Sequence, residues 1–315
     1  MSDRTQIEWT DATWNPLRGC SAVSPGCAHC YAAGVAARFA GPGQPYEGLA
    51  RFDEAGKPHW TGEIRLVEKV LSQPLRWKRP RRIFVNSMSD LFHEAVSNEF
   101  IAKVFGLMAL ASQHTFQILT KRAKRMRDWF QWAERQWANC YPGEPANALL
   151  QFLGDQDIGQ QVSRDDFAAP WPLSNVWLGV SCEDQQRADE RIPHLIATPA
   201  AVRFISAEPL LGLIDMRRFL HHGHCPEHPS EGTKAASFGC AGCSDRLHWV
   251  IAGGESGRFA RHNEPKWFQQ IRDQCLYARV PFFFNQWGGK RAAGRLLDGR
   301  EWSEFPRSRM GLTTG

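Results

Sequence analysis

One stretch of sequence, Val176-Trp177-Leu178-Gly179-Val180-Ser181, decides the fold. Polar residues come directly after it, and a helical pattern then covers Gln185–Ile196. An apolar run of this length is too short for a helix and is typical of a strand buried on both faces. The stretch therefore predicts a parallel β-strand followed by a covering helix.

The same strand–helix unit recurs along the 315 residues. Further short apolar runs occupy Thr13–Gly19, Arg82–Met88, Thr115–Thr120, Val202–Ser206, Trp249–Gly253 and Pro281–Gln286. Other helical patterns cover Ser97–Ser112, Arg122–Gln136 and Lys266–Ala278. This alternation predicts an α/β fold: one domain over residues 1–315, a parallel (β/α) barrel that is partial or full and TIM-like. A flat doubly wound sheet is the alternative.

Two segments interrupt the alternation and are interpreted as insertions, at 137–172 and 220–246. The first is rich in Pro, Gly, Asp and Gln, and the second is rich in His and Cys. Near the C-terminus, Asp298-Gly299 predicts a tight β-hairpin.

Polar residues follow almost every predicted strand. In a barrel the carboxyl ends of the strands converge on one rim, where active sites form, so these residues predict a functional site there. They are Asn86, Ser87, Ser89, Asp90, Lys121, Arg122, Ser181, Glu183, Asp184, Glu208, Glu255 and Gln286.

Composition limits the class of protein. No apolar stretch is long enough to span a membrane, and the N-terminus lacks the apolar region of a secretory signal. Nine cysteines in uneven clusters predict metal ligands and buried thiols in a reducing cytoplasm, not a disulfide framework. The net charge of +5 permits an anionic partner. Most of the 13 tryptophans are expected in the core.

Three cysteines, Cys20, Cys27 and Cys30, lie within eleven residues after the first predicted strand. A structural zinc site and a four-cysteine iron–sulfur site each need four ligands, so three thiolates leave one position open for chemistry. Zinc bound with His29 or with a distant fourth ligand is the alternative.

A second cluster lies in the later insertion, with the spacing Cys225-x2-His228-x11-Cys240-x2-Cys243. This spacing predicts a closed, structural zinc knuckle. His222 or His224 are alternatives to His228.

Several motifs carry a resemblance to known proteins. They are Trp14-Asn15-Pro16, Gly26-Cys27-x2-Cys30-Tyr31-Ala32, Ser87-Met88-Ser89-Asp90-Leu91-Phe92, Leu119-Thr120-Lys121-Arg122, Gly179-Val180-Ser181, Ala207-Glu208-Pro209-Leu210, Gly253-Gly254-Glu255-Ser256-Gly257 and Gln286-Trp287-Gly288. Together they resemble a family of uncharacterised proteins first catalogued from phage genomes, which carries a three-cysteine motif. The cysteine loop also resembles that of radical S-adenosylmethionine (SAM) enzymes, although the usual Cys-x3-Cys-x2-Cys spacing is lengthened here to Cys-x6-Cys-x2-Cys.

The radical SAM resemblance implies a [4Fe–4S] cluster on Cys20, Cys27 and Cys30, whose fourth iron binds SAM. An electron from the cluster then cleaves SAM and starts radical chemistry. The implied cofactor contacts are Asn86, Ser87, Ser89, Asp90, Ser181 and Glu183, and the implied catalytic residues are Lys121, Glu208 and Glu255. The alternatives are ion pairs of Lys121 and Arg122 with Asp90 or Glu208 across the barrel mouth, and roles of Glu208 and Glu255 as helix caps or salt-bridge partners.

The substrate and the electron donor are not specified by the sequence. A nucleobase or nucleotide is one substrate class that the charge and the tryptophans permit, and spore photoproduct lyase is a distantly similar enzyme that acts on DNA. Two other interpretations stay open. One is a nucleic-acid-binding protein without catalysis, in which zinc bound at both cysteine clusters stabilises the fold. The other is an iron–sulfur protein that does not use SAM.

Overall fold

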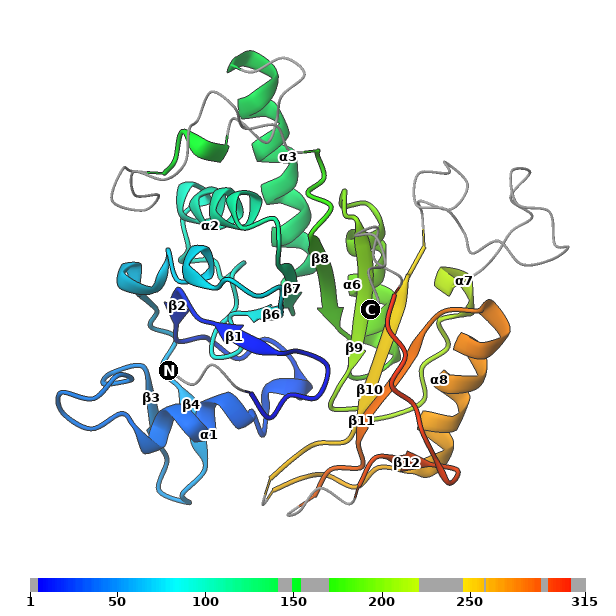
Figure 1. The fold of residues 1–315 in the computed structure, drawn as a ribbon. Helices are drawn as coiled ribbons and strands as arrows, with labels where there is room; N and C mark the ends of the chain where they lie inside the picture. The colour runs from blue at the N-terminus through cyan, green and yellow to red at the C-terminus, as the bar shows by residue number, and fades with distance from the viewer. Residues whose placement is uncertain are drawn as a thin grey trace, which may run out of the picture.

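Seven parallel strands form the main sheet of the computed structural model (Figure 1). The structure describes residues 5–140, 149–153, 170–220, 246–257, 259–289 and 294–306, without the side chains of 137–140. The strands are β1 (Ala12–Trp14), β6 (Arg82–Val85), β7 (Thr115–Thr120), β8 (Val176–Ser181), β9 (Val202–Ala207), β10 (Trp249–Gly253) and β11 (Phe282–Gln286).

The strands lie in the sheet in the order in which they occur along the chain. A doubly wound sheet reverses its order at a switch point, so the doubly wound alternative is wrong. The sheet curls into a half-barrel with its helices outside (Figure 1), and β1 and β11 form its two edges within the described residues. The prediction of a partial barrel is therefore confirmed.

The four predicted helices begin and end close to the predicted limits. They are α2 (Asn98–Leu110), α3 (Ala123–Cys140), α6 (Gln185–Ile196) and α8 (Pro265–Ala278). Two further helices, α1 (Tyr31–Arg38) and α7 (Arg217–Leu220), were not predicted. The side chains of Ser97 and Asp184 accept hydrogen bonds from the first turns of α2 and α6, respectively. These N-caps explain where the two helices start.

The first predicted strand, Thr13–Gly19, is in fact two short strands. The chain leaves the main sheet after β1 because Pro16 has no N–H to donate to a ladder. Leu17–Arg18 (β2) pairs antiparallel with Arg65–Leu66 (β5) instead. The excursion between α1 and β6 also contains the hairpin of β3 (Ala50–Phe52) and β4 (Pro58–Trp60), and the 3-10 turns η2 (Glu68–Val70) and η3 (Pro74–Arg76).

Apolar side chains pack on both faces of the sheet, which is why its strands lack polar alternation. One core lies between the sheet and the helices. A second core fills the concave face and is mostly aromatic; it comprises Trp9, Phe84, Trp177, Val202, Phe204, Trp249, Ile251 and Phe283. The expectation that most tryptophans fill the core holds for these buried rings.

The two insertions are only partly described. Leu149, Leu150 and Leu153 are buried in the outer core, whereas the predicted zinc ligands Cys225, His228, Cys240 and Cys243 lie outside the described residues. The Asp298-Gly299 turn joins β12 (Leu296–Leu297) to β13 (Arg300–Glu301) as predicted, with left-handed backbone at both turn residues. In the part of the chain that the structure describes, no helix is both long and apolar enough to cross a membrane.

A buried histidine makes the stability of the fold sensitive to pH. Burial, together with Arg203 and Arg246, lowers the pKa of His248 to about 3, and its Nδ1 accepts a hydrogen bond from the backbone N–H of Arg203 at 2.9 Å. Because the folded-state pKa is depressed, the unfolded chain binds the proton first, and stability falls as the pH drops below about 6.5.

We expect His248→Gln to reduce the loss of unfolding free energy between pH 7.5 and pH 5 by about 2 kcal/mol. Urea unfolding at both pH values measures this loss. An identical loss in the variant and the wild type would show that His248 does not titrate in this range.

Candidate cluster-binding site

The three N-terminal cysteines lie on one loop at the carboxyl ends of the strands, as predicted. Cys20 follows β2, Cys27 ends the 3-10 turn η1 (Pro25–Cys27), and Cys30 directly precedes α1. All three are half-buried free thiols. Burial, and then Asp90, raises the pKa of Cys20 to about 12, so a metal must displace the thiol proton to bind there.

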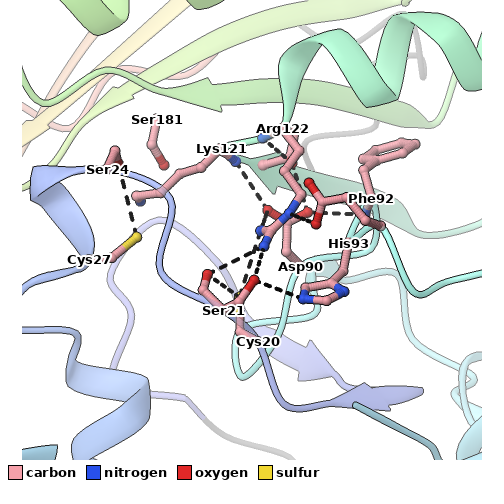
Figure 2. Close-up of polar contacts among 12 residues, drawn as sticks. Cys20, Ser21, Ser24, Cys27, Asp90, Phe92, His93, Lys121, Arg122 and Ser181 are labelled. Carbon is pink, nitrogen blue, oxygen red and sulfur yellow. Dashed lines mark hydrogen bonds and ion pairs between the residues drawn. The ribbon is translucent and has the colours of Figure 1, made fainter. Parts of the chain in front are cut away.

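An ion-pair network ties the beginning of this loop to the rim (Figure 2). Arg122, which follows β7, donates to Ser21 Oγ at 2.7 Å and approaches Cys20 Sγ at 3.8 Å. The same guanidinium pairs with Asp90 at 3.1 Å and with Glu94 at 2.8 Å. Arg122 therefore joins the cysteine loop to the segments that follow β6 and β7.

Asp90 is the buried anchor of that network. Its carboxylate accepts hydrogen bonds from Thr120 Oγ1 at 2.7 Å, Phe92 N at 3.0 Å and Lys121 N at 3.2 Å, besides the Arg122 pair. A carboxylate committed to four donors of the protein is a structural group. The prediction that Asp90 contacts a cofactor remains untested, but its carboxylate is already engaged.

Glu183, which follows β8, holds the middle of the loop. Its side chain is fully buried, accepts from Gly26 N at 3.0 Å and pairs with Arg191 at 3.0 Å. Burial alone would raise the pKa of Glu183, but Arg191 and Lys121 lower it. A methyl group on Gly26 would lie 2.9 Å from the carboxyl carbon of Glu183. The glycine before Cys27 thus allows this close approach.

Glu255, which follows β10, holds the end of the loop. It hydrogen-bonds His29 Nδ1 at 2.9 Å and pairs with Arg261 at 2.5 Å. Arg261 also donates to the backbone carbonyl of Pro25 at 3.0 Å. Although burial would raise the pKa of Glu255, the hydrogen bonds from Arg261 and His29 hold it below its ordinary value. The carboxylate of Glu255 is thus engaged by His29 and Arg261, and its predicted catalytic role stays a prediction.

Ser87 and Ser89, two of the expected cofactor contacts, use their hydroxyls within the protein. Ser89 Oγ donates to Leu17 O at 2.9 Å, and Ser87 Oγ donates to Asn15 Oδ1 at 3.2 Å. Asn15 also accepts from Met88 N at 3.1 Å. These bonds fasten the chain before the cysteine loop to the segment after β6.

Asn86 differs from its neighbours because its side chain has no partner. The residue is only 2% exposed, and neither its Oδ1 nor its Nδ2 makes a hydrogen bond with any described residue. Its backbone is left-handed, with φ at 61°, a conformation that costs energy in residues other than glycine. A buried amide without partners costs about 1–3 kcal/mol, so this group is suited to pair with a ligand.

Lys121 is the second uncommitted polar group of the rim. Its ammonium forms no hydrogen bond or ion pair with the residues that the structure describes, and its side chain extends towards Ser24 and Cys27, near Ser181 (Figure 2). It acts electrostatically on Glu183 and Glu208. Burial raises the pKa of Glu208, whose carboxylate accepts from Asn285 at 2.9 Å and Gln286 at 3.1 Å.

The donor chemistry can be tested against the two kinds of metal centre. A tetrahedral zinc ion with bonds of about 2.3 Å holds its thiolates about 3.8 Å apart. Among the described residues, no three His, Cys, Asp or Glu side chains are grouped so that they could hold one ion. In a [4Fe–4S] cluster each thiolate binds a different iron, so the thiolates are spaced more widely. The assignment of a [4Fe–4S] cluster to the three thiols therefore stays a prediction.

The other cysteines with described side chains are not part of the site. Cys182 and Cys275 are fully buried, and burial raises the pKa of both thiols. They are small buried apolar residues, as expected.

A family described as "Protein of unknown function (DUF5131)" matches residues 4–306. The chain belongs to this family. Comparison with curated proteins gives no match, and comparison with solved structures gives none either. The DUF5131 match covers the cysteine loop and every rim residue discussed above, and the family description assigns no activity to them.

Sequence reasoning missed Ser21, His93 and Arg261 as parts of this DUF5131 site. His93 Nε2 lies 3.0 Å from Ser21 Oγ, and Arg261 joins Glu255 to the loop. The Ser21–His93 contact and the bond of Arg261 to Pro25 join residues that are far apart in the chain, and no local spacing marks such long-range pairs.

Proposed function

We propose that this protein is a radical SAM-type enzyme, with a [4Fe–4S] cluster on Cys20, Cys27 and Cys30. The observation that carries the proposal is the single loop of three free thiols at the carboxyl rim of a parallel half-barrel. When bound, the cluster would supply the electron that cleaves SAM, while the protein orients the cofactor and excludes water.

The contacts that hold the cysteine loop in place support this proposal. Arg122, Glu183 and Glu255 hold successive parts of the loop from three different strand ends. A reactive centre must be held within about 0.5 Å of its productive geometry. Hydrogen bonds within the loop alone would not hold it that closely. Glu183 and Glu255 therefore act as positioning residues in this proposal.

Asn86 and Lys121 (Figure 2) are rim residues, among those the structure describes, whose side-chain polar groups are free to meet a ligand. The unpartnered amide of Asn86 offers a donor and an acceptor to a polar ligand such as the methionine end of SAM. Lys121 offers a positive charge to a carboxylate or phosphate. Burial raises the pKa of Glu208, so this carboxyl group holds a proton more readily than an exposed one. A nucleobase or nucleotide is the substrate class that we favour.

Asn86→Gly tests the SAM site. Glycine tolerates the left-handed backbone, and the lost amide has no partner in the protein, so the free energy of unfolding should change by less than about 1 kcal/mol. The affinity of the anaerobically reconstituted protein for SAM should fall about tenfold, as measured by equilibrium binding. Formation of 5′-deoxyadenosine under reduction should fall with it.

Two outcomes would contradict this role. Unchanged SAM affinity would show that the amide does not contact the cofactor. A large loss of stability with unchanged iron content would show that Asn86 is a structural residue.

A further inference from the structure

Two arginines face each other across the small sheet that leads into the cysteine loop. Arg18 on β2 is directly opposite Arg65 on β5 in the antiparallel register. Like charges in this arrangement destabilise a sheet. Neither guanidinium makes an ion pair with a carboxylate among the described residues, so no opposite charge there neutralises the two cations.

The partners of the two guanidinium groups are neutral. Arg18 Nη1 and Arg65 Nη1 both donate to the carbonyl of Pro45, at 3.2 and 3.4 Å, and Arg65 Nη2 donates to the carbonyl of Glu47 at 2.7 Å. Arg18 Nε is buried and has no hydrogen-bond partner. The backbone therefore brings two cations together and leaves one of their buried donors unused.

The surroundings favour an anion that carries a flat group. The Arg18 guanidinium lies over the ring of Tyr46, 5.2 Å from its centroid, so an aromatic surface adjoins this cation. Residues 39–81, which form the excursion between α1 and β6, carry eight Lys and Arg against five Asp and Glu, so the segment has a net positive charge.

The pair is also close to the proposed reaction centre. Arg18 is two residues before Cys20, so their Cα atoms lie within about 7 Å. An anionic group bound by Arg18 would thus hold the rest of its molecule beside the cysteine loop.

We propose that Arg18 and Arg65 form a phosphate-binding site that anchors a nucleotide substrate next to the cysteine loop. Guanidinium groups bind phosphate oxygens through paired, charge-assisted hydrogen bonds, and a bound phosphate would remove the repulsion between the two cations. The substrate class rests on the proposed function, whereas phosphate binding needs neither iron nor SAM.

The experiment measures binding to the protein without cluster or SAM. Inorganic pyrophosphate, thymidine 5′-monophosphate and a short oligothymidylate without terminal phosphates are titrated by calorimetry, with thymidine as the phosphate-free control. Pyrophosphate and at least one of the thymidylates should bind, and thymidine should not. Binding of the monophosphate alone assigns a free nucleotide, and binding of the oligomer assigns a nucleic-acid backbone.

Arg18→Gln and Arg65→Gln should each weaken phosphate binding by about tenfold or more. Arg65→Gln should leave the thermal midpoint unchanged or higher without ligand, because it removes the like-charge contact. Arg79→Gln, which removes an exposed charge from the same excursion, is the matched control and should bind normally.

The site assignment is wrong if pyrophosphate does not bind the wild type, or if Arg79→Gln weakens binding as much as Arg65→Gln. The nucleotide assignment is wrong if pyrophosphate binds but neither thymidylate does. Failure of SAM cleavage with intact phosphate binding would overturn the proposed enzyme function alone.

Discussion

Replacing Asp90 with alanine is expected to lower the free energy of unfolding by about 3–5 kcal/mol. The change leaves Arg122 without its buried counter-ion, since Glu94, its other carboxylate partner, is 64% exposed at the side chain. It also removes the acceptor of Thr120 Oγ1 and of two backbone N–H groups. Urea unfolding of the cluster-free protein measures the loss.

Asp128→Ala is the matched control, because it removes a carboxylate from a surface pair with Lys124 whose two side chains are 36% and 70% exposed. A surface pair of this kind contributes about 0.5 kcal/mol. Equal losses in the two variants would show that the Asp90–Arg122 network does not anchor the rim.

Replacing Cys27 with alanine is expected to abolish cluster assembly. After anaerobic reconstitution the wild type should be brown and contain about four irons per chain, whereas the variant should contain close to none. The physical reason is that each of the three thiols must hold its own iron, so the loss of one thiol leaves one iron of the cluster without its protein ligand. Iron content and visible absorbance measure the effect.

Cys275→Ala is the matched control for this experiment. Its thiol is fully buried between α8 and the sheet, so the variant should keep its iron. Sequence also predicts that Cys225→Ala keeps the iron, because Cys225 belongs to the second cluster. A Cys27→Ala protein that keeps its iron and absorbance, or a colourless wild type that contains zinc at both clusters, would refute the site assignment.

The strands were predictable because each is apolar on both faces. Val176–Ser181 and Trp249–Gly253 have the limits that the sequence indicated, since continuous burial leaves a short apolar run that few other elements share. The limits of the first strand were not predictable, because Pro16 ends its pairing in the main sheet. The next residues pair with β5 instead, and the position of β5 depends on the whole segment between α1 and β6.

The candidate site was predictable in place and only in part in its internal bonding. Because strand ends converge, the sequence placed the cysteine loop, Asp90, Lys121, Glu183 and Glu255 at one rim. An ion pair between Arg122 and Asp90 and a salt-bridge role for Glu255 were alternatives that the structure contains. The pair of Glu183 with Arg191 was missed, because it depends on side-chain directions that no spacing encodes. Asn86 and Lys121 are two of the described rim residues whose side-chain groups remain available.

The central claim is that Cys20, Cys27 and Cys30 hold an iron–sulfur cluster with one iron open to SAM. Electron paramagnetic resonance of the reduced, reconstituted protein tests this most directly, recorded with and without SAM. We expect the signal of a reduced [4Fe–4S] cluster whose shape and g-values change when SAM is added. A protein with no such signal, or a signal that SAM leaves unchanged, would contradict the claim.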